Sequence, residues 1–306
     1  SNGRIFNPDT GDLLGTFTSL GPDITNAFVI DSNVNRAYFI TAPFSTGFPV
    51  TATLRVFDTQ TFVPLGTFDI PNIVGTPNEM VRWGSNGLAF STNGSGVYLI
   101  QTTLIPSPDP VPSPTPTPTG TPTPTPTPPV ETAFVQPLSL NASDIIYDSV
   151  TQKIYASQPS SAGLTGNSII PITPTTATLG TPIFVGSEPN KLARSSDGQF
   201  IYVGLDGAAA VRRVNVATQQ ADLQFSLGFG QFSTGPLFVE DMEAVPGEPN
   251  AVAISRRNAG FSPRHEGVAI YDNGVKRPTT TANHTGSNVI EFSANASTLY
   301  GMNNET

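Results

Sequence analysis

Short apolar runs separated by polar turns recur along the whole chain and predict β-strands rather than helices. One recurring phrase is an apolar run, a polar turn and an aromatic-rich strand, as in "IIYDSVTQKIYAS" at 145–157. A second phrase holds two strands around a tight turn, as in "VRRVNVATQQADLQF" at 211–225. Asp, Asn, Gly and Ser fill the turns, which favours β-hairpins. The pattern predicts an all-β protein.

The two phrases alternate, and one pair of phrases makes a four-stranded antiparallel sheet. The first phrase occurs at 28–41, 81–92, 145–157, 193–205, 243–255 and 290–302, and the second at 3–17, 54–68, 211–225 and 268–280. Once a proline-rich stretch is subtracted, the first phrases begin about 40 to 52 residues apart. Four-stranded units at this spacing predict a β-propeller of six to seven blade equivalents.

The chain opens on a second phrase and closes on a first one, so its two ends each supply half a blade. We expect these halves to complete one blade, which leaves fewer free strand edges. Two arrangements fit: the ends meet within one chain, or the end of one chain pairs with the start of a following subunit or repeat. The residues expected on the joining strands are Arg4, Ile5, Phe6, Ile290, Phe292, Leu299 and Tyr300.

Three stretches, "SDGQFIYVGL", "DSVTQKIYAS" and "GSEPNKLARSSDGQ", resemble the YVTN-type and lactonase-like β-propeller repeats of bacterial exported and surface proteins. The resemblance implies an extracellular or cell-surface location and, in many relatives, a seven-bladed ring. Lactonase-like relatives use polar or acidic residues that converge at the central tunnel, often around a metal. It also implies that residues 1–105 end one propeller and residues 132–306 begin another.

Residues 106–131 contain "PTPTPTGTPTPTPTPP", which predicts a polyproline II linker because alternate prolines fix φ and remove N–H donors. Such a rod is much longer than the gap between neighbouring blades, so it suits a spacer between separate rings. Pro-interleaved Thr is also typical of O-glycosylated stalks. The candidate O-glycosylation sites are Thr115, Thr117, Thr119, Thr121, Thr123, Thr125 and Thr127.

Composition excludes several kinds of function. The net charge of −9 opposes nucleic-acid binding, which needs a basic surface. The chain has no cysteine and therefore no disulfide or thiolate metal site. No apolar run is long enough to cross a bilayer, so no transmembrane segment is expected. The sequence starts without Met or a signal peptide, which suggests a segment of a longer precursor.

The sequence shows no catalytic constellation. The chain has two histidines, His265 and His284, and Ser262 lies too close to His265 to form a triad with it. "DSNVNR" at Asp31 begins like a calcium loop, but Arg36 stands where such loops need glycine, so we expect a β-turn there.

Other polar groups have structural interpretations. The acidic stretch 239–248 has the residues to hold a cation, but we favour a solvated rim. Residues 264–266 have the residues for a polar site on a propeller face, but we favour a loop salt-bridge cluster. We expect Trp83 to pack between blades. The acidic residues of the stretch are Glu240, Asp241, Glu243 and Glu248. The Asn-x-Ser/Thr motif occurs at Asn93, Asn141, Asn283, Asn295 and Asn304, either as N-glycosylation sites or as turn residues.

The favoured function is therefore structural: extracellular propeller beads joined by a rigid, O-glycosylated linker and assembled into a fibre by strand complementation. This interpretation expects no enzyme activity, no cofactor and no metal, with the protein itself and covalent glycans as partners. The alternative is a lactonase-like enzyme or ligand-binding propeller with a site on the ring axis. We rank it second because no acidic position is seen to recur at the same point of each repeat.

Overall fold

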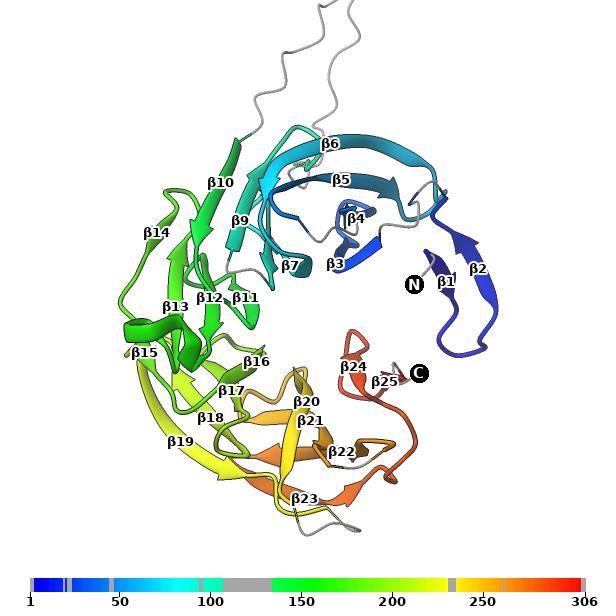
Figure 1. Cartoon of the computed structure of the whole chain (residues 1–306). Coiled ribbons are helices and arrows are strands. Elements are labelled where there is room, and N and C mark those ends of the chain that lie inside the picture. Colours follow the sequence, from blue (N-terminus) through cyan, green and yellow to red (C-terminus); the bar gives the residue numbers. More distant parts are fainter. Residues whose placement is uncertain are drawn as a thin grey trace, which may run out of the picture.

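The chain forms a ring of antiparallel sheets around one central axis (Figure 1). The structure is a computed structural model that describes residues 3–18, 20, 24–43, 47–93, 96–106, 134–230, 235–260 and 262–303. Within these residues one short helical segment occurs, the 3-10 turn η1 (Ser160–Thr165). None of the described helical structure is long and apolar enough to span a bilayer.

Five sheets follow one another around the ring, each with its first strand innermost (Figure 1). The first and second blades are β3 (Ile24–Asp31), β4 (Arg36–Thr41), β5 (Val50–Asp58) and β6 (Pro64–Ile73), then β7 (Pro77–Trp83), β8 (Gly87–Thr92), β9 (Gly96–Gln101) and β10 (Phe134–Ser139). The third is β11 (Asp144–Asp148), β12 (Lys153–Gln158), β13 (Ser168–Thr173) and β14 (Thr178–Leu179), with β15 (Ile183–Phe184) also on β13. The fourth and fifth are β16 (Pro189–Arg194), β17 (Phe200–Leu205), β18 (Ala210–Asn215) and β19 (Gln220–Ser226), then β20 (Leu237–Ala244), β21 (Ala251–Asn258), β22 (His265–Asp272) and β23 (Val275–Thr280).

The predicted turn chemistry closes the hairpins. Between β11 and β12, the Asp148 carboxylate accepts hydrogen bonds from the backbone N–H of Val150 and Thr151. Between β5 and β6, Asp58 accepts in the same way from Gln60 and Thr61. Such Asx turns reverse the chain in two or three residues. The recurring phrases are therefore confirmed as pairs of antiparallel strands.

The core lies between neighbouring blades rather than within one sheet. Trp83 illustrates this, because its side chain is 2% exposed and packs with Leu140 and Ile154 between the second and third blades. Its indole Nε1 donates a hydrogen bond to the carbonyl oxygen of Leu88 at 2.9 Å, so the buried polar atom is satisfied. The prediction that Trp83 packs between blades is confirmed.

The proline-rich stretch is an insertion within one blade. β10 pairs with β9 from Phe134 opposite Gln101 to Ser139 opposite Gly96, so the segments on either side of residues 106–131 share a sheet. The prediction that 1–105 and 132–306 belong to two propellers is therefore wrong for this chain. An insertion in a hairpin starts and ends at adjacent residues, and its length costs little. Residues 107–131 of the linker, with the seven candidate threonines, lie outside the described residues.

Two half-blades stand where the ring would close. β1 (Arg4–Phe6) pairs with β2 (Leu13–Thr16), and β24 (Val289–Phe292) pairs with β25 (Leu299–Met302). The first half packs on the first blade through Ile5 and Phe17, and the second packs on the fifth blade through Ile290. Both described ends of the chain lie at this point of the ring (Figure 1). The described residues thus hold five complete blades and two half-blades.

Candidate functional site

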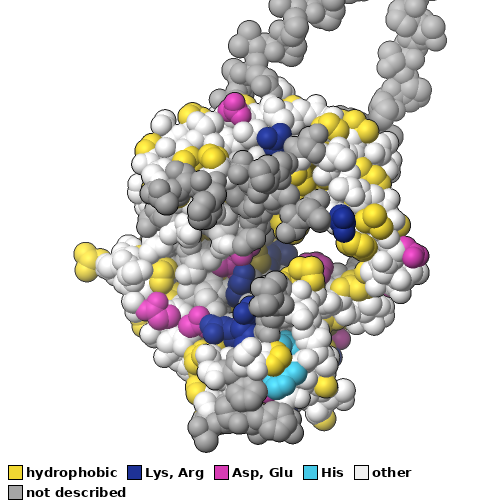
Figure 2. Space-filling model, turned by 45° about the vertical axis from the view of Figure 1, so that its right-hand side comes forward, with side chains coloured by type: hydrophobic (Ala, Val, Ile, Leu, Met, Phe, Trp, Pro, Cys, Tyr) yellow, Lys and Arg dark blue, Asp and Glu magenta, His cyan; other side chains and the backbone are white. Residues whose placement is uncertain are grey.

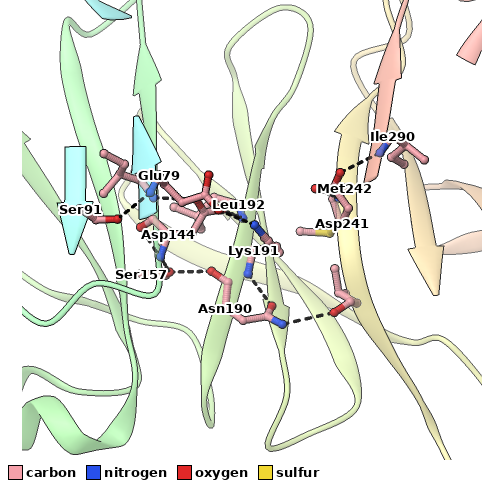
Figure 3. A network of polar contacts seen from close by, with 12 residues as sticks. Glu79, Ser91, Asp144, Ser157, Asn190, Lys191, Leu192, Asp241, Met242 and Ile290 are labelled. Atoms are coloured by element: carbon pink, nitrogen blue, oxygen red, sulfur yellow. Dashed lines mark hydrogen bonds and ion pairs between the residues drawn. The ribbon is translucent and has the colours of Figure 1, made fainter. Parts of the chain in front are cut away.

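Charged side chains gather on the innermost strands of consecutive blades. Glu79 comes from β7, Asp144 from β11 and Lys191 from β16, and the three lie together near the axis (Figure 3). β20 adds Asp241 and Glu243, and β24 adds Glu291. The space-filling view shows acidic and basic side chains around the hollow in one face of the ring (Figure 2). The charges of these five carboxyl groups and one ammonium group act on one another, and we call this set of innermost-strand residues the channel group, or channel.

Four of these residues occupy one repeated position, each directly before a buried apolar residue of the innermost strand. The apolar residue that follows each of them is buried and is a register partner of a residue on the second strand of the same blade. The pairs are Glu79–Met80, Asp144–Ile145, Lys191–Leu192 and Asp241–Met242. An acidic residue thus recurs at this position in three of the five complete described blades, with Lys191 in a fourth, although not in every repeat. "PNEM", "ASDI", "PNKL" and "VEDM" carry the signal in the sequence.

Lys191 is the cation of this group. Its Nζ lies 2.7 Å from Oε1 of Glu79, and both side chains are 32% exposed. Burial opposes the charged form of Lys191, but Asp144 and Glu79 hold the pKa of the ammonium group above its ordinary value. Lys191 thus stays charged and compensates the carboxylates around it.

Asp144 and Asp241 join adjacent blades. Asp144 accepts hydrogen bonds from the backbone N–H of Ile145 at 2.8 Å and of Leu192, in the next blade, at 2.7 Å. Asp241 likewise accepts from Met242 at 3.0 Å and from Ile290, in the next half-blade, at 2.9 Å. Burial raises the pKa of Asp144 to about 7, with Lys191 acting against the shift, and burial also raises the pKa of Asp241. These two residues have a clear structural role.

Glu243 and Glu291 have no such role. Neither side chain forms a hydrogen bond or ion pair within the part of the chain that the structure describes. Burial raises the pKa of Glu243 to about 9, and the neighbouring Glu291 and Asp241 add to the shift. Burial and Asp241 also raise the pKa of Glu291. At neutral pH the Glu243 carboxyl therefore holds its proton, because nothing nearby compensates its charge.

The channel carboxyls are not arranged as a metal site. Among the described residues no three His, Asp or Glu side chains converge closely enough to hold a metal ion. A metal ion needs several ligand atoms within a few ångströms of one point. The carboxyls instead lie on successive innermost strands, which suits an elongated cation with several N–H donors.

The acidic stretch 239–248 does not form a single solvated rim. Glu240 pairs with Arg264 at 2.7 Å, and Glu248 forms an ion pair with Arg277. Asp241 and Glu243 belong to the channel instead, because side chains two apart on a strand share one face. The acidic-rim prediction is therefore wrong for these two residues.

The predicted loop cluster at 264–266 is also wrong in part. His265 and Glu266 begin strand β22 and are buried, while Arg264 forms the predicted kind of ion pair with Glu240.

The carboxylate of Asp31 accepts a hydrogen bond from the Asn33 N–H at 3.0 Å and forms an ion pair with Arg82 at 2.8 Å. Asp31 thus serves a turn and an ion pair between the first two blades.

Two of the N-glycosylation candidates serve as turn or loop acceptors. Asn93 Oδ1 accepts from the Thr76 N–H at 2.7 Å, and Asn295 Oδ1 accepts from the Ser297 N–H at 2.9 Å. Asn141 donates to Ser161 Oγ at 2.9 Å, Asn283 lies in the loop after β23, and Asn304 lies outside the described residues. Their glycosylation stays a prediction. The strand residues chosen for assembly lie on β1, β24 and β25, as expected.

No protein-family model matches the sequence, and no curated protein is similar to it. Solved structures are similar in fold. A candidate 6-phosphogluconolactonase of Bacteroides fragilis has a TM-score of 0.62 at 13% identity, covering 97% of this chain and 81% of that one. The hydrazine synthase of Kuenenia stuttgartiensis has a TM-score of 0.63 at 12% identity, covering 95% and 76%. The WD40 repeats of RRP9 have a TM-score of 0.61 at 10% identity, covering 97% and 80%. These identities show the fold alone, and the β-propeller prediction is confirmed.

Proposed function

We propose that this chain is a ligand-binding propeller whose axial channel takes an organic cation with two or more amino groups. The observation that carries the proposal is the pair Glu243 and Glu291, which face the channel without any polar partner among the described residues. Glu243 is half-buried and Glu291 is exposed. A carboxylate that is partly removed from water needs a positive partner or hydrogen-bond donors to remain ionised. A bound ammonium group supplies both.

The shape of the charged group supports a linear polyamine. Lys191 already shows how an ammonium group sits in this channel, since it pairs with Glu79 and lies close enough to Asp144 and Asp241 for their charges to act on it. Glu243 and Glu291, on the next two innermost strands, offer the equivalent place for a second ammonium group. Charge-assisted hydrogen bonds of this kind are about twice as strong as neutral ones.

The proposed activity is binding rather than catalysis. Asp144 and Asp241, two of the five channel carboxyls, are held by backbone N–H groups of two adjacent blades. That arrangement fixes the ring and leaves those groups little freedom to transfer protons. The lactonase-like reaction remains a weaker proposal, supported only by the fold of one similar structure.

Spermidine binding at pH 8 is expected to release protons. Glu243 has a pKa of about 9 and is mostly protonated at this pH, and an ammonium group beside it lowers that pKa. Calorimetric titration in phosphate and in Tris buffer, whose ionisation enthalpies differ, measures the released protons. The double variant Glu243→Gln/Glu291→Gln is expected to bind at least about tenfold more weakly and to release none.

Glu248→Gln provides the matched control, because Glu248 pairs with Arg277 outside the channel. That variant should bind spermidine as the unmodified protein does. Equal affinity in the channel double variant, or no heat of binding at about 1 mM spermidine, would refute the proposal.

Strand complementation is a second candidate function, favoured by the two half-blades. In the described residues β1 pairs with β2 alone and β25 with β24 alone, and Tyr300 Oη donates to Asp9 Oδ1 at 3.3 Å between the halves. The edges of β1 and β25 are therefore available to each other. Pairing within one chain closes the ring, and exchange of β1 between copies gives the fibre expected from the sequence.

Deletion of residues 1–17 is expected to abolish chain-to-chain assembly, because it removes the strands that β25 would pair with. Light scattering over a range of protein concentrations measures the assembly. Tyr300→Phe removes one exposed hydrogen bond and leaves the strand edge intact, so this control should assemble normally. Undiminished assembly of the truncated chain would rule out the strand exchange.

A further inference from the structure

A second cavity lies on the fifth blade, beside the loops that precede β20 and follow β23, and shares no residue with the channel. Its volume is about 440 Å³. The walls come from the start of β20, from β21 and β22, and from the loop that follows β23. The lining includes Phe229, Leu237, Arg256, Glu266, Thr280 and Asn283.

Two opposite charges are buried in this cavity wall. Arg256 is 8% exposed and Glu266 is 5% exposed. Arg256 Nη2 donates to the backbone carbonyl of Glu266 at 2.7 Å, and Nε donates to that of Gly267 at 3.2 Å. A guanidinium group has five N–H donors, and Arg256 also hydrogen-bonds the Tyr271 hydroxyl, so at most two donors are left for a ligand. Glu266 Oε1 is buried without a hydrogen-bond partner among the described residues.

A β-bulge places this pair. Between Ser255 opposite Val268 and Arg257 opposite His265, one residue of β21 faces two residues of β22, namely Glu266 and Gly267. Gly267 has φ +79°, and a Cβ there would lie 2.4 Å from the Thr281 carbonyl oxygen. Glycine is therefore required at this place, and the bulge turns the Glu266 side chain toward the cavity wall.

The same register position in another blade also faces a cavity. Ser157 and Ser255 occupy equivalent positions in the third and fifth blades. Ser157 Oγ donates a hydrogen bond to the Asn190 carbonyl of the next blade at 2.6 Å. Ser255 Oγ donates to the Ser287 carbonyl, before the next half-blade, also at 2.6 Å. The residue after Ser157 is Gln158, which lines a cavity of about 450 Å³ and also has a buried side-chain oxygen without a partner among the described residues. Charged residues line the Arg256 cavity, whereas the lining of the Gln158 cavity has none.

We propose that the Arg256–Glu266 cavity binds a neutral saccharide of one or two rings. The wall offers both a carboxylate and a guanidinium group with no net charge, and a sugar hydroxyl donates to the first while it accepts from the second. Thr280 and Asn283 add polar atoms, and Phe229, 72% exposed, presents an aromatic ring to the apolar face of a sugar. A few convergent polar groups in a concave site are typical of small-molecule binding. The inference does not depend on the channel proposal.

Saturation-transfer NMR with glucose, galactose, mannose and N-acetylglucosamine, and with their disaccharides, tests the proposal. At least one of these sugars is expected to bind. Glu266→Gln should weaken it by about tenfold, because a neutral amide is a weaker acceptor than a carboxylate. Phe229→Ala changes an exposed side chain, so it should reduce binding several-fold without affecting the fold.

Gln158→Leu and Glu243→Gln are the matched controls, one in the equivalent cavity and one in the channel. Both should bind the sugar as the unmodified protein does. Three results would overturn the proposal: no saturation transfer from any of these sugars at about 10 mM, unchanged affinity in both Glu266→Gln and Phe229→Ala, or binding of glycine and β-alanine instead of sugars.

Discussion

Replacing Lys191 with methionine is expected to destabilise the protein by about 2–3 kcal/mol at pH 7.5. Removal of one partner from a buried ion pair typically costs 3–5 kcal/mol, and the 32% exposure of Lys191 and Glu79 reduces this. The loss arises because Glu79 and Asp144 are left without their cation. Urea denaturation at pH 7.5 and at pH 5 measures it. The loss should be smaller at pH 5, where Asp144, with its pKa of about 7, is protonated.

Two further variants separate charge from packing. Lys191→Arg keeps the positive charge and should lose less stability than Lys191→Met. Addition of Glu79→Gln to Lys191→Met should restore part of the lost stability, since the unpaired carboxylate is then absent. An equal loss at both pH values, with no rescue by Glu79→Gln, would mean that Lys191 acts through its hydrocarbon chain alone.

The strands were predictable because each phrase carries two independent signals. In "IIYDSVTQKIYAS" the apolar runs specify β11 and β12, and Asp148 supplies the acceptor that closes their turn. Local sequence therefore specifies both the strands and the reversal between them. The same holds for the half-blades, whose missing partners followed from the order of the phrases alone.

The length of the proline-rich linker did not predict that the strands before and after it belong to the same sheet. Gln101 and Phe134 are register partners, although the linker separates them in sequence. The short strand β10 has one proline and an exposed, mixed pattern, so its match to β9 is weak in the sequence. A stiff insertion gives no sign of whether its two ends meet again. Only the pairing of β9 with β10 decides that.

The channel was missed because its residues differ in charge and type. Glu79, Asp144, Lys191 and Asp241 occupy one position of the blade, but a search for a recurring acidic residue is interrupted by Lys191. Alignment on the buried apolar residue that follows each of them would have found the position. The sequence could not show that Asp144 and Asp241 are held by N–H groups of the next blade while Glu243 and Glu291 have no such bonds.

Replacing Glu243 with glutamine is expected to stabilise the protein at pH 9 by about 2 kcal/mol and to have little effect at pH 5. The full pKa shift corresponds to about 6 kcal/mol, and partial exposure of the Glu243 side chain reduces it. The folded protein raises the pKa of Glu243 to about 9 from the ordinary 4.5, so the folded state binds more protons than the unfolded state between these values. Stability therefore falls as pH rises from about 4.5 to 9. Glutamine is neutral at every pH and removes this loss. Urea denaturation of both proteins from pH 5 to pH 9 measures the difference.

Glu248→Gln tests whether this effect belongs to the channel. Glu248 forms an ion pair with Arg277, so its replacement removes an attraction instead of a repulsion and should give no gain at pH 9. A parallel gain in both variants would show a general effect of the net charge of −9. If only Glu243→Gln gains stability at pH 9, the Glu243 carboxylate must be repelled by the other carboxyls of the channel. Added spermidine should then stabilise the unmodified protein more than Glu243→Gln at pH 9, because a ligand that binds only the folded state stabilises it more the more tightly it binds.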